Sequence, residues 1–244
     1  MLKGKYALIT GASRGIGKET VKLFAQNQAN LILVARDEEA LQKIQNELNS
    51  LCKVEIYPCD LQKSNNIKEL FGFIKQYTKQ LDIVIHAAGA MHVGMQMMTK
   101  EEDVQEIFTT NFFSAYELSR YSAKMMLRQK SGSIIFLSSV MALRGAKAHS
   151  AYSASKAALE GLMRSLAKEY APHIRINTVA PGVVQTDMTA SLSEEEKERI
   201  IASTPLARLA TPNEIAQTLL FLSSDMASFI TAQTLRVDGG LCSF

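Results

Sequence analysis

Short apolar runs alternate with longer amphipathic segments along almost the whole chain. Residues 6–10 form the first apolar run, a helical pattern continues through Ala25, and residues 30–36 form a second run. Apolar runs of this length, bounded by turn residues, are typical of strands buried on both faces, whereas a 3.6-residue period predicts amphipathic helices. The predicted strands are 6–10, 30–36, 53–57, 82–85, 133–137, 174–179 and 234–237.

The segments between these strands predict helices, some with recognisable starts. The predicted helices are 38–50, 64–78, a long helix after Thr99 that carries Asn111, a helix that carries Tyr152, residues 193–203, and a helix after Thr211. Thr99 followed three residues later by Glu102 predicts a capping box. Thr211 and Glu214 predict another, with Pro212 at the first helical position.

The alternation of strands and helices predicts the fold class. Seven apolar strands alternating with helices indicate an α/β fold, in which a doubly wound parallel sheet has helices on both faces. No internal repeat, low-complexity tract or linker interrupts residues 1–244, so we expect a single domain. Ligands of such sheets bind beyond the carboxyl ends of the strands, and the residues that follow each strand are therefore the first candidates for a site.

Composition narrows the class of protein. The 244 residues are 47% hydrophobic and 21% charged, which is ordinary for a globular protein, and the dispersed net charge of +3 does not indicate a nucleic-acid partner. No apolar stretch approaches the ~20 residues of a membrane span, and the first residues lack the apolar core of a signal peptide. Cys52, Cys59 and Cys242 form no Cys-x-x-Cys pair and have no histidine cluster, which predicts reduced cysteines, no metal site and a cytoplasmic or organelle-matrix location.

A glycine-rich turn follows the first strand. Gly11-Ala12-Ser13-Arg14-Gly15-Ile16-Gly17 lies between that strand and the first helix. Glycines permit a tight turn and close approach of a ligand, and the start of a helix offers free N–H groups to an anion. The spacing is Gly-x-x-x-Gly-x-Gly, and its place between a strand and a helix predicts a site for the phosphates of a dinucleotide.

The end of the second strand bears on which dinucleotide is bound. An enzyme that uses NAD places an acid here to hold the ribose hydroxyls, and one that uses NADP places a base near the 2′-phosphate. Ala35 and Arg36 stand at this position, and Arg14 lies in the glycine turn. Two guanidinium groups suit a phosphate because of their forked geometry, which predicts NADPH. A solvated Arg36 is the alternative, and the adjacent Asp37 leaves NAD open.

Further candidates follow the other strands. Asp60 could accept a hydrogen bond from an adenine amine, and the small residues Ala88 and Gly89 would let a planar ligand lie against the backbone. Ser139 follows the fifth strand, and Pro181-Gly182 follow the sixth. These positions converge with the glycine turn at one edge of the predicted sheet, where a ligand of this fold binds.

The predicted helix after Ser139 carries the strongest chemical signal. Tyr152 and Lys156 are four residues apart, so their Cβ atoms would lie roughly 5–6 Å apart on one helix face. A positive charge beside a phenol stabilises the phenolate and lowers its pKa from the usual ~10. Tyr152 with Lys156 is on its own more often a core tyrosine and a solvated lysine. The convergence of candidate ligand residues at the same edge favours a proton-transfer pair.

These motifs carry a family likeness. Over essentially its whole length the chain resembles the short-chain dehydrogenase/reductase family, and it is most similar to the 3-oxoacyl-[acyl-carrier-protein] reductase branch. The matching segments are 10–17, Asp60, Ala88-Gly89, Asn111, Ser139, Tyr152 with Lys156, 177–182, 186–188 and 237–240. The resemblance implies a Rossmann fold and the NADPH-dependent reduction of a ketone to a secondary alcohol.

The resemblance also implies a role for each matching residue. Tyr152 would be the general acid, Lys156 would lower its pKa and bind the nicotinamide ribose, and Ser139 would hydrogen-bond the carbonyl. Asn111 would hold a water that relays protons toward Lys156. The residues implied in coenzyme binding are Gly11, Ser13, Arg14, Gly15, Ile16, Gly17, Arg36, Asp60, Leu61, Ala88, Gly89, Tyr152, Lys156, Pro181, Gly182, Val184 and Thr186.

Two departures from the family pattern stand out. His86 occupies a position where the family usually has asparagine, and we expect a structural substitute rather than a new proton-transfer group. We expect Arg128, Lys130 and Arg164 near the cleft, where they could meet an acidic acyl carrier protein, with hydrogen-bonded or solvated surface charge as the alternative. Residues 171–173 lack the basic residue and the extra length expected in the acyl-carrier reductases. The resemblance therefore specifies the chemistry better than it specifies the substrate.

The motifs are compatible with more than one substrate class. A 3-oxoacyl thioester, a sugar and a secondary metabolite are all compatible with the motifs. The methionine-rich segment 91–98 suggests an apolar wall, whereas Arg144 and His149 could select a polar or acidic substrate. The apolar content of helices 102–128 and 151–170, together with the family likeness, predicts a homotetramer.

Two other functions are compatible with parts of the sequence. A non-catalytic NADPH-binding regulator would be expected to have lost a catalytic residue, and all of Asn111, Ser139, Tyr152 and Lys156 are present. An NAD-dependent alcohol dehydrogenase would need an acid near Arg36, which only Asp37 could supply.

Overall fold

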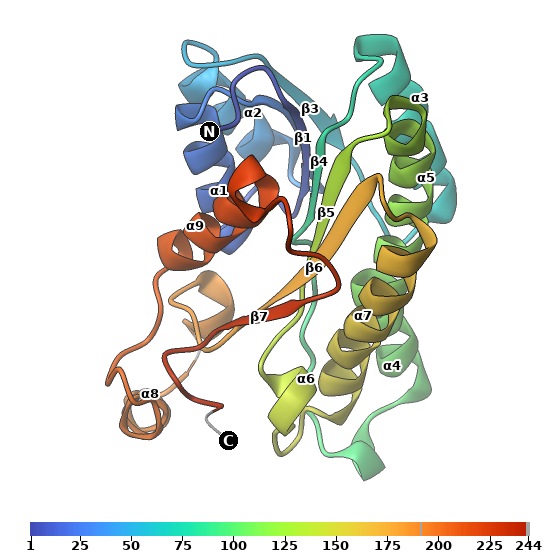
Figure 1. Cartoon of the computed structure of the whole chain (residues 1–244). Helices are drawn as coiled ribbons and strands as arrows, with labels where there is room; N and C mark the ends of the chain where they lie inside the picture. The colour runs from blue at the N-terminus through green and yellow to red at the C-terminus, as the bar shows by residue number, and fades with distance from the viewer. Residues whose placement is uncertain (191, 243–244) are drawn as a thin grey trace.

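The computed structural model of the chain describes residues 1–190 and 192–242. One seven-stranded sheet runs through it in the order β3-β2-β1-β4-β5-β6-β7, and all neighbouring strands are parallel (Figure 1). The strands are β1 Tyr6–Thr10, β2 Asn30–Ala35, β3 Val54–Pro58, β4 Ile83–His86, β5 Gly132–Leu137, β6 Ile174–Pro181 and β7 Thr234–Val237. The predicted doubly wound α/β fold is confirmed.

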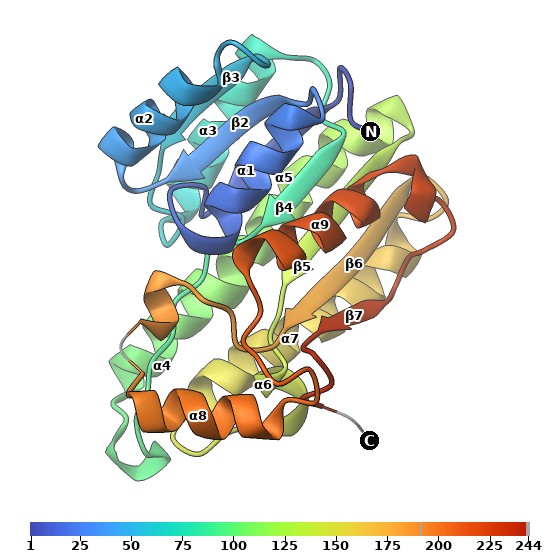
Figure 2. The ribbon, with the colours of Figure 1, turned by 90° about the vertical axis from the view of Figure 1, so that its left-hand side faces the viewer.

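Helices cover both faces of the sheet. The α-helices are α1 Gly15–Gln26, α2 Glu38–Leu48, α3 Ser64–Tyr77, α4 Glu101–Phe108, α5 Ser114–Gln129, α6 Met141–Arg144, α7 Ser150–Glu169, α8 Glu194–Ser203 and α9 Pro212–Ser223. Figure 1 shows α1, α2 and α9 on one face and α3, α5 and α7 on the other. Figure 2 shows α4, α6 and α8 gathered at the end of the sheet where the strands finish.

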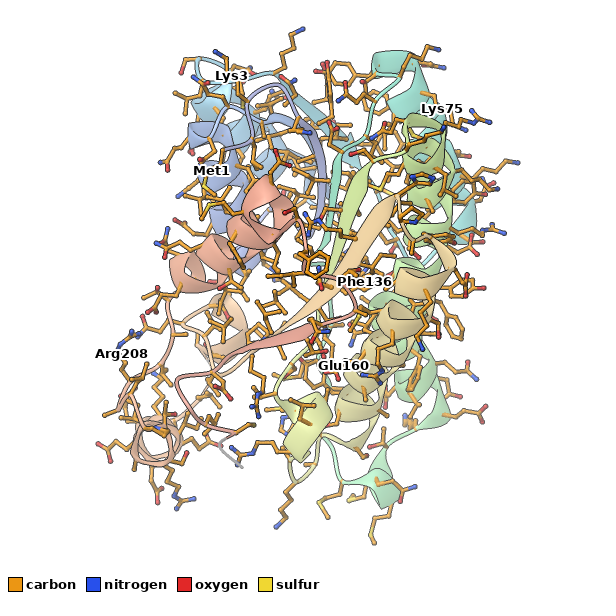
Figure 3. The ribbon with its side chains drawn as sticks, in the orientation of Figure 1. Met1, Lys3, Lys75, Phe136, Glu160 and Arg208 are labelled. Carbon is orange, nitrogen blue, oxygen red and sulfur yellow. The ribbon has the colours of Figure 1, made fainter. Side chains whose placement is uncertain are left out.

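The strand sequences explain why both faces are covered. Alternate residues of a strand point to opposite faces, so a strand with helices on both sides must be apolar throughout. Leu31 and Leu33 of β2 lie in the apolar cluster under α1, α2 and α9, whereas Ile32 and Val34 lie in the cluster under α3, α5 and α7. Phe136 lies deep in the molecule, while Lys75 and Arg208 lie at its periphery (Figure 3).

The predicted caps had different outcomes. Thr211 caps α9 as predicted: its hydroxyl accepts from the N–H of Glu214 at 3.4 Å, and the Glu214 carboxylate accepts from the N–H of Thr211 at 2.8 Å. The capping box at Thr99 is wrong, because α4 begins at Glu101 and the Thr99 hydroxyl donates instead to the carbonyl of Met95 at 3.1 Å. The preceding 3-10 turn, Gln96–Met98, brings that carbonyl within reach.

The predicted long helix through Asn111 is interrupted. Between α4 and α5 lies a π-helical segment, Thr109–Phe113, with Asn111 at its centre. In a π-helical turn each backbone N–H donates to the carbonyl five residues earlier. Such turns are rare and are frequent at functional sites. No described helix has the length and apolar character of a membrane-crossing segment.

Candidate active site

A cavity of about 790 Å³ lies at the carboxyl ends of β1, β2 and β4. It is enclosed by the glycine turn, the ends of β2 and β3, the loop after β4 and the loop after β6. The predicted coenzyme residues that line it are Gly11, Ser13, Arg14, Gly15, Ile16, Gly17, Arg36, Asp60, Leu61, Ala88, Gly89 and Thr186. The structure therefore brings together residues that are up to 175 positions apart, from Gly11 to Thr186.

The glycine turn forms a cradle that side chains would fill. Gly11 has φ of +66°, and a Cβ there would lie 2.8 Å from the backbone nitrogen of Ala88. A Cβ on Gly17 would overlap the carbonyl oxygen of Gly11. Helix α1 starts here with no side-chain cap and no acidic residue in its first turn. Uncapped N–H groups and the positive end of the helix dipole fit the phosphates of a dinucleotide.

Charged groups at the far end of the cavity fit an additional phosphate. Arg14 and Arg36 both line the cavity and both are exposed. Asp37 is engaged as the N-cap of α2, where its Oδ1 accepts from the N–H of Ala40 at 2.9 Å. The acid that could have held ribose hydroxyls is thus used to cap a helix. Asp37 lines the cavity beside the two arginines, and its capping bond occupies one of its carboxylate oxygens.

Tyr152 and Lys156 lie one turn apart on α7, as predicted, and both are buried. The Lys156 Nζ is 5.9 Å from the centre of the Tyr152 ring and donates to the carbonyl of Leu137 at 2.8 Å. Leu137 and Gly89 line the cavity, and a Cβ on Gly89 would lie 3.2 Å from the same Nζ. The ammonium therefore lies directly behind the cavity wall.

Ser139 faces Tyr152 from the end of β5. Its hydroxyl accepts from the N–H of Met141 at 3.2 Å, at the start of α6, and hydrogen-bonds the phenol of Tyr152. The short helix α6 and the strand β5 thus fix the serine beside the tyrosine. Two hydroxyl groups side by side can donate to one carbonyl oxygen.

Burial dominates the acid–base properties of this pair. It raises the pKa of Tyr152, while the hydrogen bond from Ser139 lowers it by less. Burial also lowers the pKa of Lys156 to about 8. That Lys156 lowers the pKa of the phenol stays a prediction. In this structure its ammonium donates to the Leu137 carbonyl, and burial of the phenol gives a net rise of the Tyr152 pKa.

Asn111 is completely buried in the π-helical segment. Its Oδ1 accepts from the N–H of Ala90 at 2.8 Å, and its Nδ2 donates to the Ala90 carbonyl at 3.0 Å and to the hydroxyl of Ser155 at 2.9 Å. Both amide hydrogens are used within the protein. The side chain therefore clamps the loop after β4 to α7, next to Lys156.

Comparison with known proteins agrees with this geometry. A family model described as enoyl-(acyl carrier protein) reductase matches residues 11–242. A protein of Thermotoga maritima named 3-oxoacyl-[acyl-carrier-protein] reductase FabG is 37% identical over 242 residues, which cover 98% of each chain. The chain belongs to the short-chain dehydrogenase/reductase family. It is accordingly an oxidoreductase that acts on CH–OH or C=O groups with a nicotinamide coenzyme.

More distant relatives in the family carry other names. A Xenopus laevis protein named carbonyl reductase family member 4 is 35% identical, over 97% of this chain and 98% of the relative. The solved structure of a putative gluconate dehydrogenase from Agrobacterium tumefaciens superposes with a TM-score of 0.95 at 27% identity, covering 100% of this chain and 98% of that one. The family thus spans relatives whose names point to different substrates.

The loop after β6 divides its predicted residues between two tasks. Thr186 lines the cavity, and its side chain caps the short 3-10 turn at Asp187–Thr189. Pro181 and Gly182 do not line it: the Pro181 carbonyl accepts from Val140 at 3.0 Å, and the Gly182 N–H donates to Val237 at 3.0 Å. Val184 is buried behind the wall. These three residues hold the loop in place.

The basic residues considered for an acyl carrier protein do not gather at this cavity. Arg128 and Lys130 end α5 immediately before β5 begins, so they lie at the opposite end of the sheet. Arg164 is three turns along α7 from Tyr152, roughly 18 Å away, and pairs with Glu160 at 3.8 Å. Their predicted position near the cleft of the same chain is wrong, because parallel strands all begin at one end of the sheet and all finish at the other.

Some residues of the site could not be found from the sequence. Gln62 lines the cavity and donates to the hydroxyl of Thr110 at 2.8 Å and to Glu106 at 3.3 Å. These bonds join the loop after β3 to the π-helical segment across more than 40 residues. No local motif marks such a contact, because only the folded sheet brings the two segments together.

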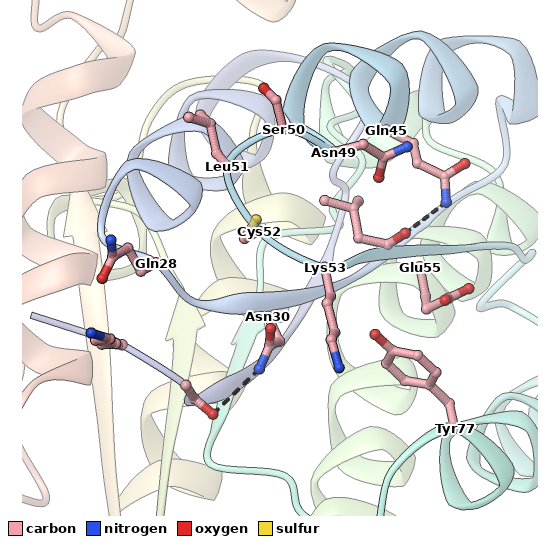
Figure 4. A pocket seen from close by; sticks show the side chains of 13 residues that line it. Gln28, Asn30, Gln45, Asn49, Ser50, Leu51, Cys52, Lys53, Glu55 and Tyr77 are labelled. Carbon is pink, nitrogen blue, oxygen red and sulfur yellow. Dashed lines mark hydrogen bonds between the residues drawn. The ribbon is translucent and has the colours of Figure 1, made fainter.

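A second hollow, of about 830 Å³, lies where β1–β3 begin (Figure 4). Gln28, Asn30, Asn49 and Lys53 surround it with polar side chains, and the phenol of Tyr77 points toward it. None of the predicted coenzyme residues lines it, whereas twelve of them line the first cavity, behind whose wall Lys156 lies. The cavity at the opposite end of the sheet is therefore the candidate active site.

Proposed function

We propose that the chain is an NADPH-dependent reductase that converts a ketone to a secondary alcohol. The observation that carries this proposal is the pair of adjacent hydroxyl groups, Ser139 and Tyr152, with the Lys156 ammonium one helical turn away, behind the wall of the glycine-cradled cavity. A 3-oxoacyl thioester is the substrate class supported by the name of the Thermotoga relative.

The side chains divide the work of the reaction as follows. Ser139 and Tyr152 donate hydrogen bonds to the substrate carbonyl oxygen, which stabilises the negative charge that develops there. A bound reduced nicotinamide supplies the hydride. Tyr152 transfers its proton to the forming alkoxide, and positioned proton transfer of this kind contributes about 10²–10⁴-fold in rate. The Lys156 charge stabilises the phenolate that remains.

The choice of coenzyme rests on Arg14, Arg36 and Asp37. The guanidinium groups would hold the 2′-phosphate, and the capping role of Asp37 removes the acid that NAD would need. Steady-state kinetics with each coenzyme test this proposal. We expect the value of kcat/KM to be at least about 100-fold higher with NADPH, and a preference for NADH would contradict the assignment.

The substrate is tested by following NADPH absorbance with a panel of ketones. The panel holds 3-oxoacyl thioesters on acyl carrier protein and on a small thiol, ketosugars and simple ketones. We expect turnover of 3-oxoacyl thioesters. Reduction of none of the panel compounds by the purified protein would contradict the proposed function.

An alcohol dehydrogenase acting on an acidic sugar is the second candidate. The exposed Arg144 ends α6 beside the loop that leads to Tyr152, where it suits a carboxylate. The solved putative gluconate dehydrogenase is similar in fold and sequence. Sustained reduction of NAD by sugar acids, without activity on the ketone panel, would favour this candidate.

The assembly we propose is a homotetramer. Phe113, the residue before α5, is 55% exposed, Tyr116 in the first turn of α5 is 47% exposed, and Leu127 near the end of α5 is 38% exposed. Exposed aromatic side chains in a row on one helix are typical of an interface between proteins. Phe112 packs against both aromatic rings and would support such a contact. A cytoplasmic location stays a prediction.

A further inference from the structure

His86 is the last residue of β4 and is completely buried. Thr10 of β1 and Phe136 of β5 flank it in the sheet, and the Phe136 ring meets the imidazole edge-on at 6.4 Å between centroids. Its Nε2 lies 2.9 Å from the hydroxyl oxygen of Ser114. The histidine therefore joins the central sheet to the first residue of α5.

Ser114 closes the π-helical turn in an unusual way. In an α-helix its N–H would donate to the carbonyl of Thr110, four residues earlier. Here the N–H donates to Thr109, five residues earlier, and the hydroxyl of Ser114 donates to the Thr110 carbonyl at 2.5 Å. The hydroxyl thus takes the place of the N–H that the π-helical turn has moved away.

This arrangement decides which imidazole nitrogen carries the proton. The Ser114 hydroxyl has a single hydrogen, which it gives to Thr110, so its oxygen can only accept from His86. The Nε2 of His86 is therefore protonated, and its Nδ1 has no hydrogen-bond partner among the described residues. Burial, and secondarily the charge of Lys156, lower the pKa of His86 to about 3, and a hydrogen bond with its own backbone opposes them by less. The ring is therefore neutral at pH 7.

The π-helical turn determines where Asn111 points. Returning this turn to α-helical geometry would remove one residue from the turn and rotate the side chains by about 100°. Asn111 would then leave its three hydrogen bonds to Ala90 and Ser155. Ala90 lies four residues after His86 and lines the cavity. The end of β4 and its loop therefore hold the turn at two points, through Ser114 and through Asn111.

We propose that His86 is a positioning residue for Asn111. Its Nε2–H, acting through the hydroxyl of Ser114, holds the π-helical turn in the geometry that clamps Ala90 to α7 beside Lys156. The consequence for catalysis rests on the proposed function, whereas the structural coupling does not.

Four variants test the coupling. His86→Phe keeps the ring and removes the donor, whereas His86→Gln keeps an amide donor that reaches about as far as Nε2. Ser114→Ala removes the link itself. Ser122→Ala is the matched control, because Ser122 is also buried on α5 and its hydroxyl also donates to the carbonyl four residues earlier, at 2.7 Å to Leu118. Amide hydrogen exchange of residues 109–113 and steady-state kinetics are measured for each.

In His86→Phe and Ser114→Ala we expect faster exchange in residues 109–113 and a kcat at least about tenfold lower, with the KM for NADPH within about twofold. His86→Gln should restore most of both losses, and Ser122→Ala should match the wild type. The proposal is overturned if Ser114→Ala and His86→Phe behave like Ser122→Ala, or if kcat falls without faster exchange in residues 109–113.

The tautomer is measured in the wild-type protein, so it does not depend on any variant folding. Nitrogen NMR of the imidazole at pH 7 should show a proton on Nε2 and none on Nδ1. A proton on Nδ1, or a charged ring, overturns the proposal. If the wild type reduces no ketone of the panel, the proposed function fails, while hydrogen exchange and the tautomer still decide whether His86 holds the turn.

Discussion

At the phenol of Tyr152 two effects act in opposite directions, since burial raises the pKa and the hydrogen bond from Ser139 lowers it. The spacing between Tyr152 and Lys156 indicated the pair correctly but not its environment. A four-residue spacing specifies a shared helix face, whereas the depth of that face depends on which elements pack against it. The Lys156 ammonium is likewise buried against the Leu137 carbonyl, a contact across 19 residues.

Replacing Tyr152 by phenylalanine tests the proton donor. The ring volume is retained, so the fold and the affinity for NADPH should change little. We expect kcat for ketone reduction to fall by about 10²–10⁴-fold because no other group beside Ser139 is placed to give a proton. Steady-state kinetics with a fluorescence titration of NADPH measure both quantities. A kcat within tenfold of the wild type would mean that another residue is the acid.

Lys156 should make stability depend on pH. Its pKa is about 8 in the folded protein and 10.5 in the unfolded chain, so the unfolded chain binds more protons between these values. The free energy of unfolding should therefore rise from pH 8 to pH 10.5, by about 3 kcal/mol at most. Lys156→Met should flatten this rise and raise Tm at pH 7 while abolishing activity. Thermal melts across this range measure it, and an unchanged slope would contradict the assignment.

Among the elements, the two Thr-x-x-Glu segments show what a local pattern can and cannot predict. Thr211 and Glu214 form the predicted cap of α9, whereas Thr99 is held by a carbonyl of the turn before it. The π-helical segment at Thr109–Phe113 had no sequence signal either. The hydrogen bond of Thr99 and the π-helical segment both depend on contacts with residues outside the predicted helix.

The two threonines therefore give a matched pair of stability variants. Thr211→Ala should lower the free energy of unfolding by about 1 kcal/mol, because it leaves helical N–H groups without their cap. This corresponds to a Tm lower by about 2–4 °C for a chain of this size. Thr99→Ala should lower Tm by less than half as much. Equal losses in calorimetric melts would mean that Thr99 also caps its helix.

For the whole molecule, a sheet with seven parallel strands places the carboxyl ends of all its strands, and with them the candidate site, at one end of the sheet. The same geometry places Arg128 and Lys130 at the opposite end, where the strands begin, away from the cavity of their own chain. That residues 1–244 form one domain stays a prediction, as does the tetramer.

The tetramer is tested at Phe113. Phe113→Arg introduces a charge into the exposed aromatic row on α5 and should lower the mass measured by light scattering at micromolar concentration. Leu51→Arg is a control, because Leu51 is 51% exposed but lies in the turn after α2, far from α5. A monomeric wild-type mass, or an unchanged mass of Phe113→Arg, would contradict the proposed interface.

The sequence by itself determined the order and type of the strands, the glycine cradle and the helical spacing of Tyr152 and Lys156. Each of these depends on hydrophobic period, backbone freedom or helical pitch, which are properties of neighbouring residues. Only the tertiary structure decided that Asp37 caps a helix, that Lys156 is desolvated, and that His86 reaches Ser114 across 28 residues. These features depend on groups far apart in the chain, and burial and hydrogen bonding between such groups are set only when the sheet and its helices pack together.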